Sequence, residues 1–234
     1  MENLKVKKYD NKINLKNLSG FQLIEKYNTA CLLEIKTGFI SLLAKNRKPI
    51  PDSIVLGITG SELSWLQINP SNIKLDFKKA SSWDSSVRGR LNIDPEYAIN
   101  IITNKIKPFQ QKNKKLNTEK PIFNRLIGAG LGLTPAGDDF TIGVLGVAAH
   151  TSDELFAFVA DRVKKVLHRT TSLSRHFLRL ALQKRYSEDF LKLFSALEKE
   201  DIEEIKKNLD SILNYGHSSG YYTVKGILWA LKKI

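Results

Sequence analysis

The hydrophobic pattern of this chain changes its period along the sequence, and this change limits the folds open to it. Before about residue 104, short runs of branched and aromatic residues alternate with turn formers, which is typical of β-strands. After about residue 122, apolar residues recur three and four positions apart, which is typical of amphipathic helices. We therefore predict an α+β fold with a β-rich N-terminal half and an all-α C-terminal half.

The β-rich half, residues 1–104, is expected to form a small antiparallel sheet or a partial barrel. Its strand candidates are Phe21–Tyr27, Cys31–Ile35, Phe39–Leu43, Ser53–Gly57 and Leu66–Ile68. The single cysteine, Cys31, cannot form an internal disulfide, and we interpret it as a small core residue. Near the end of this half, Asp94 followed by Pro95 indicates a helix start, because aspartate caps helices and proline is tolerated in the first turn.

The helical half, residues 122–234, contains several helices with recognisable starts. The candidate N-caps are Ser152, Thr170 or Thr171, Ser187 and Asp201. Between the two halves, residues 105–121 are rich in lysine and show little apolar periodicity, so we expect a basic loop or linker there.

The charge of the chain restricts its partners. The 234 residues carry a net charge of +13, but the lysines are scattered, and only Phe109 accompanies their densest cluster. A surface for stacking bases is therefore not predicted, and a small anionic substrate fits the charge better than a nucleic acid. The chain also has neither a run of apolar residues long enough to cross a bilayer nor a signal-peptide core at its N-terminus. We expect no nucleic-acid or membrane partner and a cytoplasmic location.

The strongest local feature is the glycine-rich segment Gly128–Asp139, which precedes the apolar run Phe140–Ala149. Glycine permits positive φ, and a glycine-rich turn before a helix exposes free N–H groups that favour anions. The candidate substrate-binding residues here are Gly130, Gly132, Thr134 and Gly137. The segment is neither a Walker A motif nor a dinucleotide fingerprint, and an ordinary turn capped by an aspartate is the alternative.

Asp138 and Asp139 supply more carboxylates than a helix cap needs. Their side chains diverge by about 100° on a helix, so we expect one to face a ligand and the other to hold the turn through backbone N–H groups. Both are candidate catalytic residues. A cofactor is not identified, although Mg²⁺ held through water by either aspartate is left open.

Two further hydroxyl-rich segments begin helices. The candidate substrate-binding residues in them are Thr170, Thr171, Ser174, Ser218 and Ser219. His217 is the third candidate catalytic residue, because an unperturbed imidazole titrates near neutral pH. Helix capping and a structural histidine are the alternatives.

Other kinds of site find little support. The four histidines show no metal-ligand spacing, and the chain lacks a nucleophile elbow. Because the glycine-rich segment and the two hydroxyl-rich segments each lie at a helix start, we expect all three to meet at one pocket.

The three segments in this order resemble a bacterial family. Their sequences are Gly-Leu-Thr-Pro-Ala-Gly-Asp-Asp-Phe ending at Phe140, Thr-Thr-x-x-Ser ending at Ser174, and Gly-His-Ser-Ser-Gly ending at Gly220. The family includes the AllH-type subunit of oxamate carbamoyltransferase. Residues 50–54 also look like its Pro-x-Ser-Ile segment. The chain departs from the family at Ala136, where serine is expected, so a hydroxyl at that position is not required.

The resemblance implies a subunit that works with other chains to transfer a carbamoyl group between phosphate and oxamate. Its substrates would be small anions, carbamoyl phosphate and oxamate or oxalurate, and His217 would polarise the carbamoyl oxygen or shuttle a proton. Two alternatives remain from the residues alone. One is a Mg²⁺-dependent phosphoryl-transfer or nucleotide-binding enzyme, and the other is a non-catalytic ligand-binding or assembly subunit.

Overall fold

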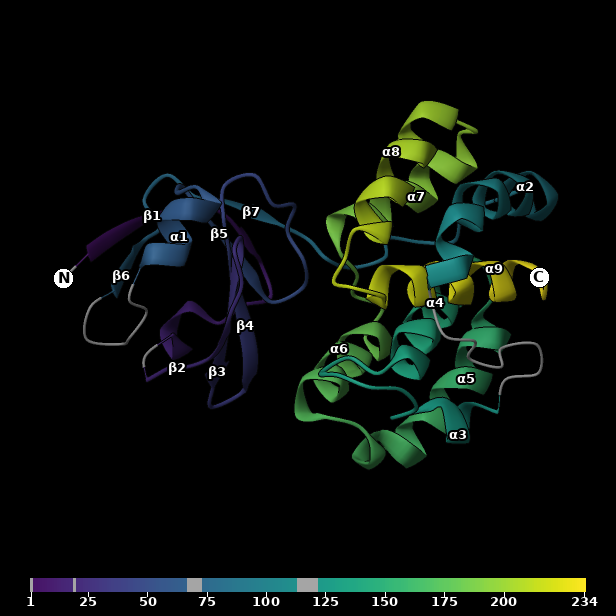
Figure 1. Ribbon diagram of the computed structural model, residues 1–234, viewed down its shortest axis with the longest axis horizontal. Helices are drawn as coiled ribbons and strands as arrows, with labels where there is room; N and C mark the ends of the chain where they lie inside the picture. Colours follow the sequence, from purple (N-terminus) through teal and green to yellow (C-terminus); the bar gives the residue numbers. More distant parts are fainter. Residues whose placement is uncertain (1, 19, 67–72, 113–121) are drawn as a thin grey trace. The chain divides into compact units, whose positions relative to one another are not determined.

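The computed structural model describes residues 2–18, 20–66, 73–112 and 122–234 (Figure 1). The chain divides into two compact units, Met1–Ser85 and Ser86–Ile234. The first unit contains the strands and the second is helical, which confirms the α+β class. The domain bounds predicted from the sequence, at residues 104 and 121, stay predictions.

The first unit is built on one curled sheet that forms a half-barrel (Figure 1). Its strands are β1 (Glu2–Asp10), β2 (Gln22–Lys26), β3 (Ala30–Ile35), β4 (Gly38–Leu43), β5 (Ser53–Leu56), β6 (Ile73–Asp76) and β7 (Ser81–Trp83). The strand order is β2-β3-β4-β5-β1-β6, and β7 also pairs with β1. Because β4 and β5 run parallel, as β1 does with β6 and β7, the sheet is mixed. The partial barrel expected from the sequence is thus the form adopted.

The strand predicted over residues 66–68 is only partly within the described chain. Leu66 ends a short helix, α1 (Gly60–Trp65), and residues 67 and 68 lie outside the described residues. A short 3-10 helix, η1 (Leu15–Asn17), follows β1.

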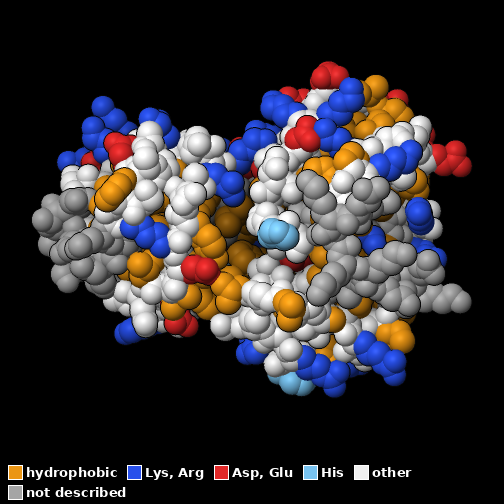
Figure 2. Space-filling view, viewed as in Figure 1, with side chains coloured by type: hydrophobic (Ala, Val, Ile, Leu, Met, Phe, Trp, Pro, Cys, Tyr) orange, Lys and Arg blue, Asp and Glu red, His pale blue; other side chains and the backbone are white. Residues whose placement is uncertain are grey.

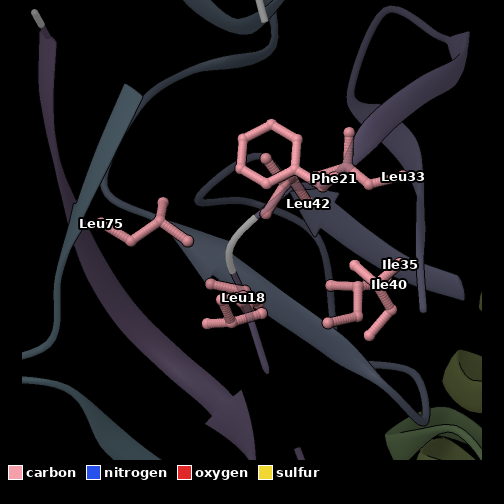
Figure 3. A pocket seen from close by; sticks show the side chains of 8 residues that line it. Leu18, Phe21, Leu33, Ile35, Ile40, Leu42 and Leu75 are labelled. Atoms are coloured by element: carbon pink, nitrogen blue, oxygen red, sulfur yellow. The ribbon is translucent and has the colours of Figure 1, made fainter. Parts of the chain in front are cut away.

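The half-barrel has its own apolar core. Cys31 is fully buried in it, as expected of a small core residue. A small cavity within this core is lined by apolar side chains (Figure 3): Leu18, Phe21, Leu33, Ile35, Ile40, Leu42, Ile54 and Leu75. Since an anion needs polar donors, this cavity does not match the predicted anionic substrate.

The second unit is a bundle of helices around a separate core. The helices are α2 (Pro95–Ile106), α3 (Phe123–Leu126), α4 (Ala136–Thr151), α5 (Asp153–Val166), α6 (Ser172–Leu182), α7 (Glu188–Glu198), α8 (Ile202–Leu213) and α9 (Ser219–Leu231), with 3-10 segments η2 (Lys107–Lys112) and η3 (Leu167–Arg169). Five predicted N-caps are confirmed by side-chain bonds to the first turn: Asp94, Ser152, Thr171, Ser187 and Asp201. In the predicted basic loop, residues 105–112 are helical, and residues 113–121 lie outside the described chain.

Helix α4 is almost entirely buried and packs closely against α9. A Cβ added at Gly143 would lie 2.1 Å from the carbonyl oxygen of Thr223, and one added at Gly226 would lie 2.0 Å from that of Phe140. Only glycine permits this approach of the two backbones. The hydroxyl of Thr134, just before α4, also lies 2.9 Å from that of Ser219, the first residue of α9, so the two helices begin close together.

The described residues form no continuous basic patch on the face drawn in Figure 2. There, Lys and Arg side chains occur in several separate groups with acidic and apolar side chains between them. None of the helices in the described ranges combines the length and apolar character needed to span a membrane.

Candidate functional site

Three helix starts meet at the glycine-rich turn. The Thr134 hydroxyl, just before α4, lies 2.9 Å from the Ser219 hydroxyl at the start of α9. The Thr171 hydroxyl, at the start of α6, donates to the Leu133 carbonyl at 2.6 Å. The three segments singled out in the sequence are therefore joined by hydrogen bonds. Their helix dipoles place partial positive charge around one turn.

Two of these helix starts have no side-chain cap. Pro135 occupies the N-cap of α4, and Ser218 occupies that of α9 without a side-chain bond to the first turn. Ser218 is therefore not the capping serine that the alternative interpretation required. At α4, the N–H groups of Gly137, Asp138 and Asp139 already donate to the carbonyls of Ala129 and Pro135, so what this helix start offers an anion is the positive end of its dipole.

The turn needs its glycines for two different reasons. Gly128, Gly130 and Gly132 have φ values of +81°, +125° and +93°, which other residues rarely adopt. A Cβ at Gly130 would lie 2.6 Å from the Ala136 nitrogen, whereas a Cβ at Gly132 would meet nothing within 4 Å. The base of the turn is therefore tightly packed, and its tip at Gly132 is open.

Gly137 is part of the packing. A Cβ at this position would lie 2.0 Å from the Leu126 carbonyl oxygen, and its N–H donates to the Ala129 carbonyl at 2.8 Å. Its predicted contact with substrate is not visible in this arrangement, because its N–H is already used within the fold.

Asp138 is completely buried and accepts three hydrogen bonds. The Gly128 N–H donates to Oδ1 at 2.8 Å, and the Ser174 hydroxyl donates to Oδ2 at 2.6 Å. The Thr170 hydroxyl also donates to Oδ2. Asp138 thus holds the turn through a backbone N–H, as expected of one of the two carboxylates. Thr170 and Ser174 use their hydroxyl protons to position it.

Asp139 has very different surroundings, although it is the next residue. Its side chain is 6% exposed, and Oδ2 is buried without a hydrogen-bond partner in the described structure. Burial raises the pKa of Asp139 to about 8; a hydrogen bond with Ser219 lowers it, and the charge of Asp138 raises it. Near neutral pH, these surroundings therefore favour the protonated form of the Asp139 carboxyl group.

His217 is exposed in the turn between α8 and α9. Among the described residues, no hydrogen bond or ion pair joins it to Asp138 or Asp139. It lies two residues before Ser219, so the chain brings it to the edge of the same cluster. Its catalytic role stays a prediction.

Arg175 was not identified from the sequence, yet it fastens the loop that precedes α6. Its guanidinium donates to the carbonyls of Leu167 at 3.0 Å, Thr170 at 3.1 Å and His168 at 3.4 Å. A cation in the first turn of a helix opposes the helix dipole. The unfavourable position of this cation in the sequence could have indicated that Arg175 has a local positioning role.

The described residues offer few ligands for a metal ion. No three His, Cys, Asp or Glu side chains gather there as metal ligands. Of the two aspartates, Asp138 accepts hydrogen bonds on both oxygens, whereas Oδ2 of Asp139 is buried without a hydrogen-bond partner in the described part of the chain.

Comparison with known proteins gives a family match within the helical region. Residues 126–231 match the family model described as oxamate carbamoyltransferase subunit AllH. The matched region includes the glycine-rich turn and both hydroxyl-rich segments, so the resemblance inferred from these three motifs is confirmed. No curated protein and no solved structure gives a significant match to the chain.

Proposed function

We propose that this chain, whose residues 126–231 match the AllH family, is a subunit of an oxamate carbamoyltransferase-like enzyme that binds a small anionic substrate at the glycine-rich turn. The observation that carries the proposal is the meeting of three helix starts, two of them uncapped, around an open turn. This arrangement would bring helix dipoles, the N–H groups of the turn and hydroxyls to an anion without a Walker-type lysine.

The proposed substrates are carbamoyl phosphate and oxamate, with oxalurate as product. In the reaction, the oxamate nitrogen attacks the carbamoyl carbon, so that a C–N bond forms and the C–O bond to phosphate breaks. Inorganic phosphate leaves, and the nitrogen loses a proton. His217 is the group we assign to accept that proton or polarise the carbamoyl oxygen, because one imidazole nitrogen can accept a proton while a ring N–H can donate a hydrogen bond to an oxygen.

The binding groups divide into two kinds. Gly130 and Gly132 would offer backbone N–H groups, while Thr134, Ser218 and Ser219 would offer hydroxyls. The remaining candidates, Thr170, Thr171 and Ser174, support the proposal as positioning residues, since their hydroxyls bond to Asp138 or to the turn backbone.

Other chains of the enzyme would complete the catalytic site. The family description names a subunit, and Leu131, at the tip of the turn, is 89% exposed. A large apolar side chain beside the anion site is suited to contact with a partner chain.

The test is calorimetric titration of the purified chain with carbamoyl phosphate, oxamate and inorganic phosphate. We expect the wild type to bind with a Kd in the millimolar range or tighter. The double variant Thr134→Val, Ser219→Ala should bind about tenfold more weakly, because each hydrogen bond lost to the ligand costs about 0.5–1.5 kcal/mol and about 1.4 kcal/mol is a tenfold change in affinity. The matched control is Ser152→Ala, which changes a serine at the start of α5 and should leave affinity unchanged. Absence of binding by all three ligands, or equal affinity in the double variant, would refute the proposal.

A further inference from the structure

The inference concerns Asp139 and deepens the proposed function, on which it rests. Asp139 lies in the first turn of α4 and meets the start of α9 through Ser219. Its Oδ2 is fully buried and has no hydrogen-bond partner within the described ranges. A buried polar atom left without a partner destabilises a fold, so its presence at an anion site indicates a group that a ligand satisfies.

The contrast with Asp138 shows that this is a property of one position and not of the whole cluster. Asp138 is more deeply buried, yet three donors are arranged around its two oxygens. The fold therefore supplies donors to the neighbouring carboxylate and withholds them from Oδ2 of Asp139. A negatively charged Asp139 would also repel an anionic substrate.

We propose that Asp139 acts as a neutral carboxylic acid that recognises the amide end of the substrate, the carboxamide of oxamate or the carbamoyl group. A carboxylic acid presents an O–H donor beside a C=O acceptor, and a primary amide presents an N–H donor beside a C=O acceptor. The two groups pair through two hydrogen bonds. A carboxylate ligand, which has only acceptors, can form only one of them.

The protonation needed for this pairing is consistent with the surroundings of Asp139. Burial is the main cause of its raised pKa, and Asp138 is the neighbouring charge that adds to it. The elements that meet the start of α4 also carry ionisable side chains: Arg125 on α3, Arg175 on α6, His217 before α9, and Tyr221, Tyr222 and Lys225 on α9. Arg175 bonds to carbonyl oxygens, and Lys225 lies 5.8 Å from the centre of the Tyr221 ring.

The experiment compares oxamate with oxalate, in which a carboxylate replaces the amide, for the full chain and for Asp139→Asn and Asp139→Leu. We expect the wild type to bind oxamate more tightly than oxalate. Leucine should weaken oxamate binding about tenfold or more, and it should weaken the binding of inorganic phosphate much less because phosphate has no amide to recognise. Asparagine keeps a donor beside an acceptor, so it should retain most of the oxamate affinity.

The pH profile gives a second readout that a purely structural role would not move. Above about pH 8, the oxamate affinity of the wild type should fall by up to about tenfold per pH unit, whereas Asp139→Asn should show no such fall. The Asn variant also keeps the test decisive if the Leu variant fails to fold.

The outcomes separate the two proposals. If phosphate binds but neither variant changes the preference for oxamate over oxalate or the pH profile, the role of Asp139 is refuted and the anion site stands. If phosphate, oxamate and carbamoyl phosphate all fail to bind the wild type, the proposed function is refuted, and the inference falls with it.

Discussion

At the scale of single residues, adjacent aspartates with opposite surroundings carry different tasks. Asp138 organises the glycine-rich turn through three donors, while one oxygen of Asp139 has no hydrogen-bond partner among the described residues. Sequence reasoning could predict that two neighbouring carboxylates diverge on a helix. It could not tell which one holds the turn, because Thr170 and Ser174 lie more than thirty residues further along the chain.

The stability of the chain should depend on pH through Asp139. Between its ordinary value of 3.8 and the folded value of about 8, the folded chain binds a proton that the unfolded chain has lost. Stability therefore falls as pH rises through this window. Asp139→Asn removes this titration. As pH rises through the window, the free energy of unfolding of the variant should therefore increase relative to that of the wild type by up to about 1.4 kcal/mol per pH unit.

Urea unfolding of both proteins at several values from pH 5 to 9 measures this difference. The exposed substitution Glu154→Gln serves as the control and should follow the wild-type curve. Parallel pH curves for Asp139→Asn and the wild type would contradict the prediction.

Asp138 should matter mainly for stability. Asp138→Ala leaves the Gly128 N–H and the hydroxyls of Thr170 and Ser174 without their acceptor, and we expect a loss of about 3 kcal/mol or more. Asp138→Asn keeps one acceptor oxygen and should lose less. Denaturant unfolding checks the order, and a loss below about 1 kcal/mol for alanine would show that the three bonds do not fasten the turn.

At the scale of elements, local signals predicted much of the fold. The helix starts at Asp94, Ser152 and Asp201 were visible because an N-cap and the apolar stripe behind it are close in sequence. Strand β1 was missed although Leu4 and Val6 are buried, since its other positions are largely charged and only pairing with β5, β6 and β7 reveals it. Sheet direction was also beyond local signals, because parallel pairing depends on distant segments.

The close packing of α4 against α9 holds together the two helix starts that form part of the candidate site. Substituting alanine for glycine within a helix ordinarily stabilises by up to about 1 kcal/mol. At Gly226, the added methyl group would meet the Phe140 carbonyl, so Gly226→Ala should destabilise by about 1–3 kcal/mol. Thermal unfolding measures it beside Lys164→Ala, an exposed control on α5 that should change stability little. A stabilised Gly226→Ala would mean that the two helices are not held in this close contact.

At the scale of the whole molecule, two separate cores divide the chain, and the family match falls entirely within the helical one. The three helix starts, the turn and both aspartates belong to that unit. The anion site should therefore depend on the integrity of the helical core and not on the presence of the half-barrel.

This argument predicts where the chain can be cut. In α2, Ala98 and Ile102 are fully buried and Ile106 is 2% exposed, and the helix packs against α8 and α9. A fragment of residues 86–234 keeps these contacts, so it should unfold cooperatively and bind inorganic phosphate and oxamate with wild-type affinity. A fragment of residues 122–234 exposes the apolar surface that α2 covers, and loss of several fully buried side chains costs several kcal/mol, a large part of the stability of a small domain. It should therefore aggregate or unfold without a cooperative transition. Calorimetric melting and titration of both fragments test this, and a stable, binding-competent fragment of residues 122–234 would show that α2 is dispensable.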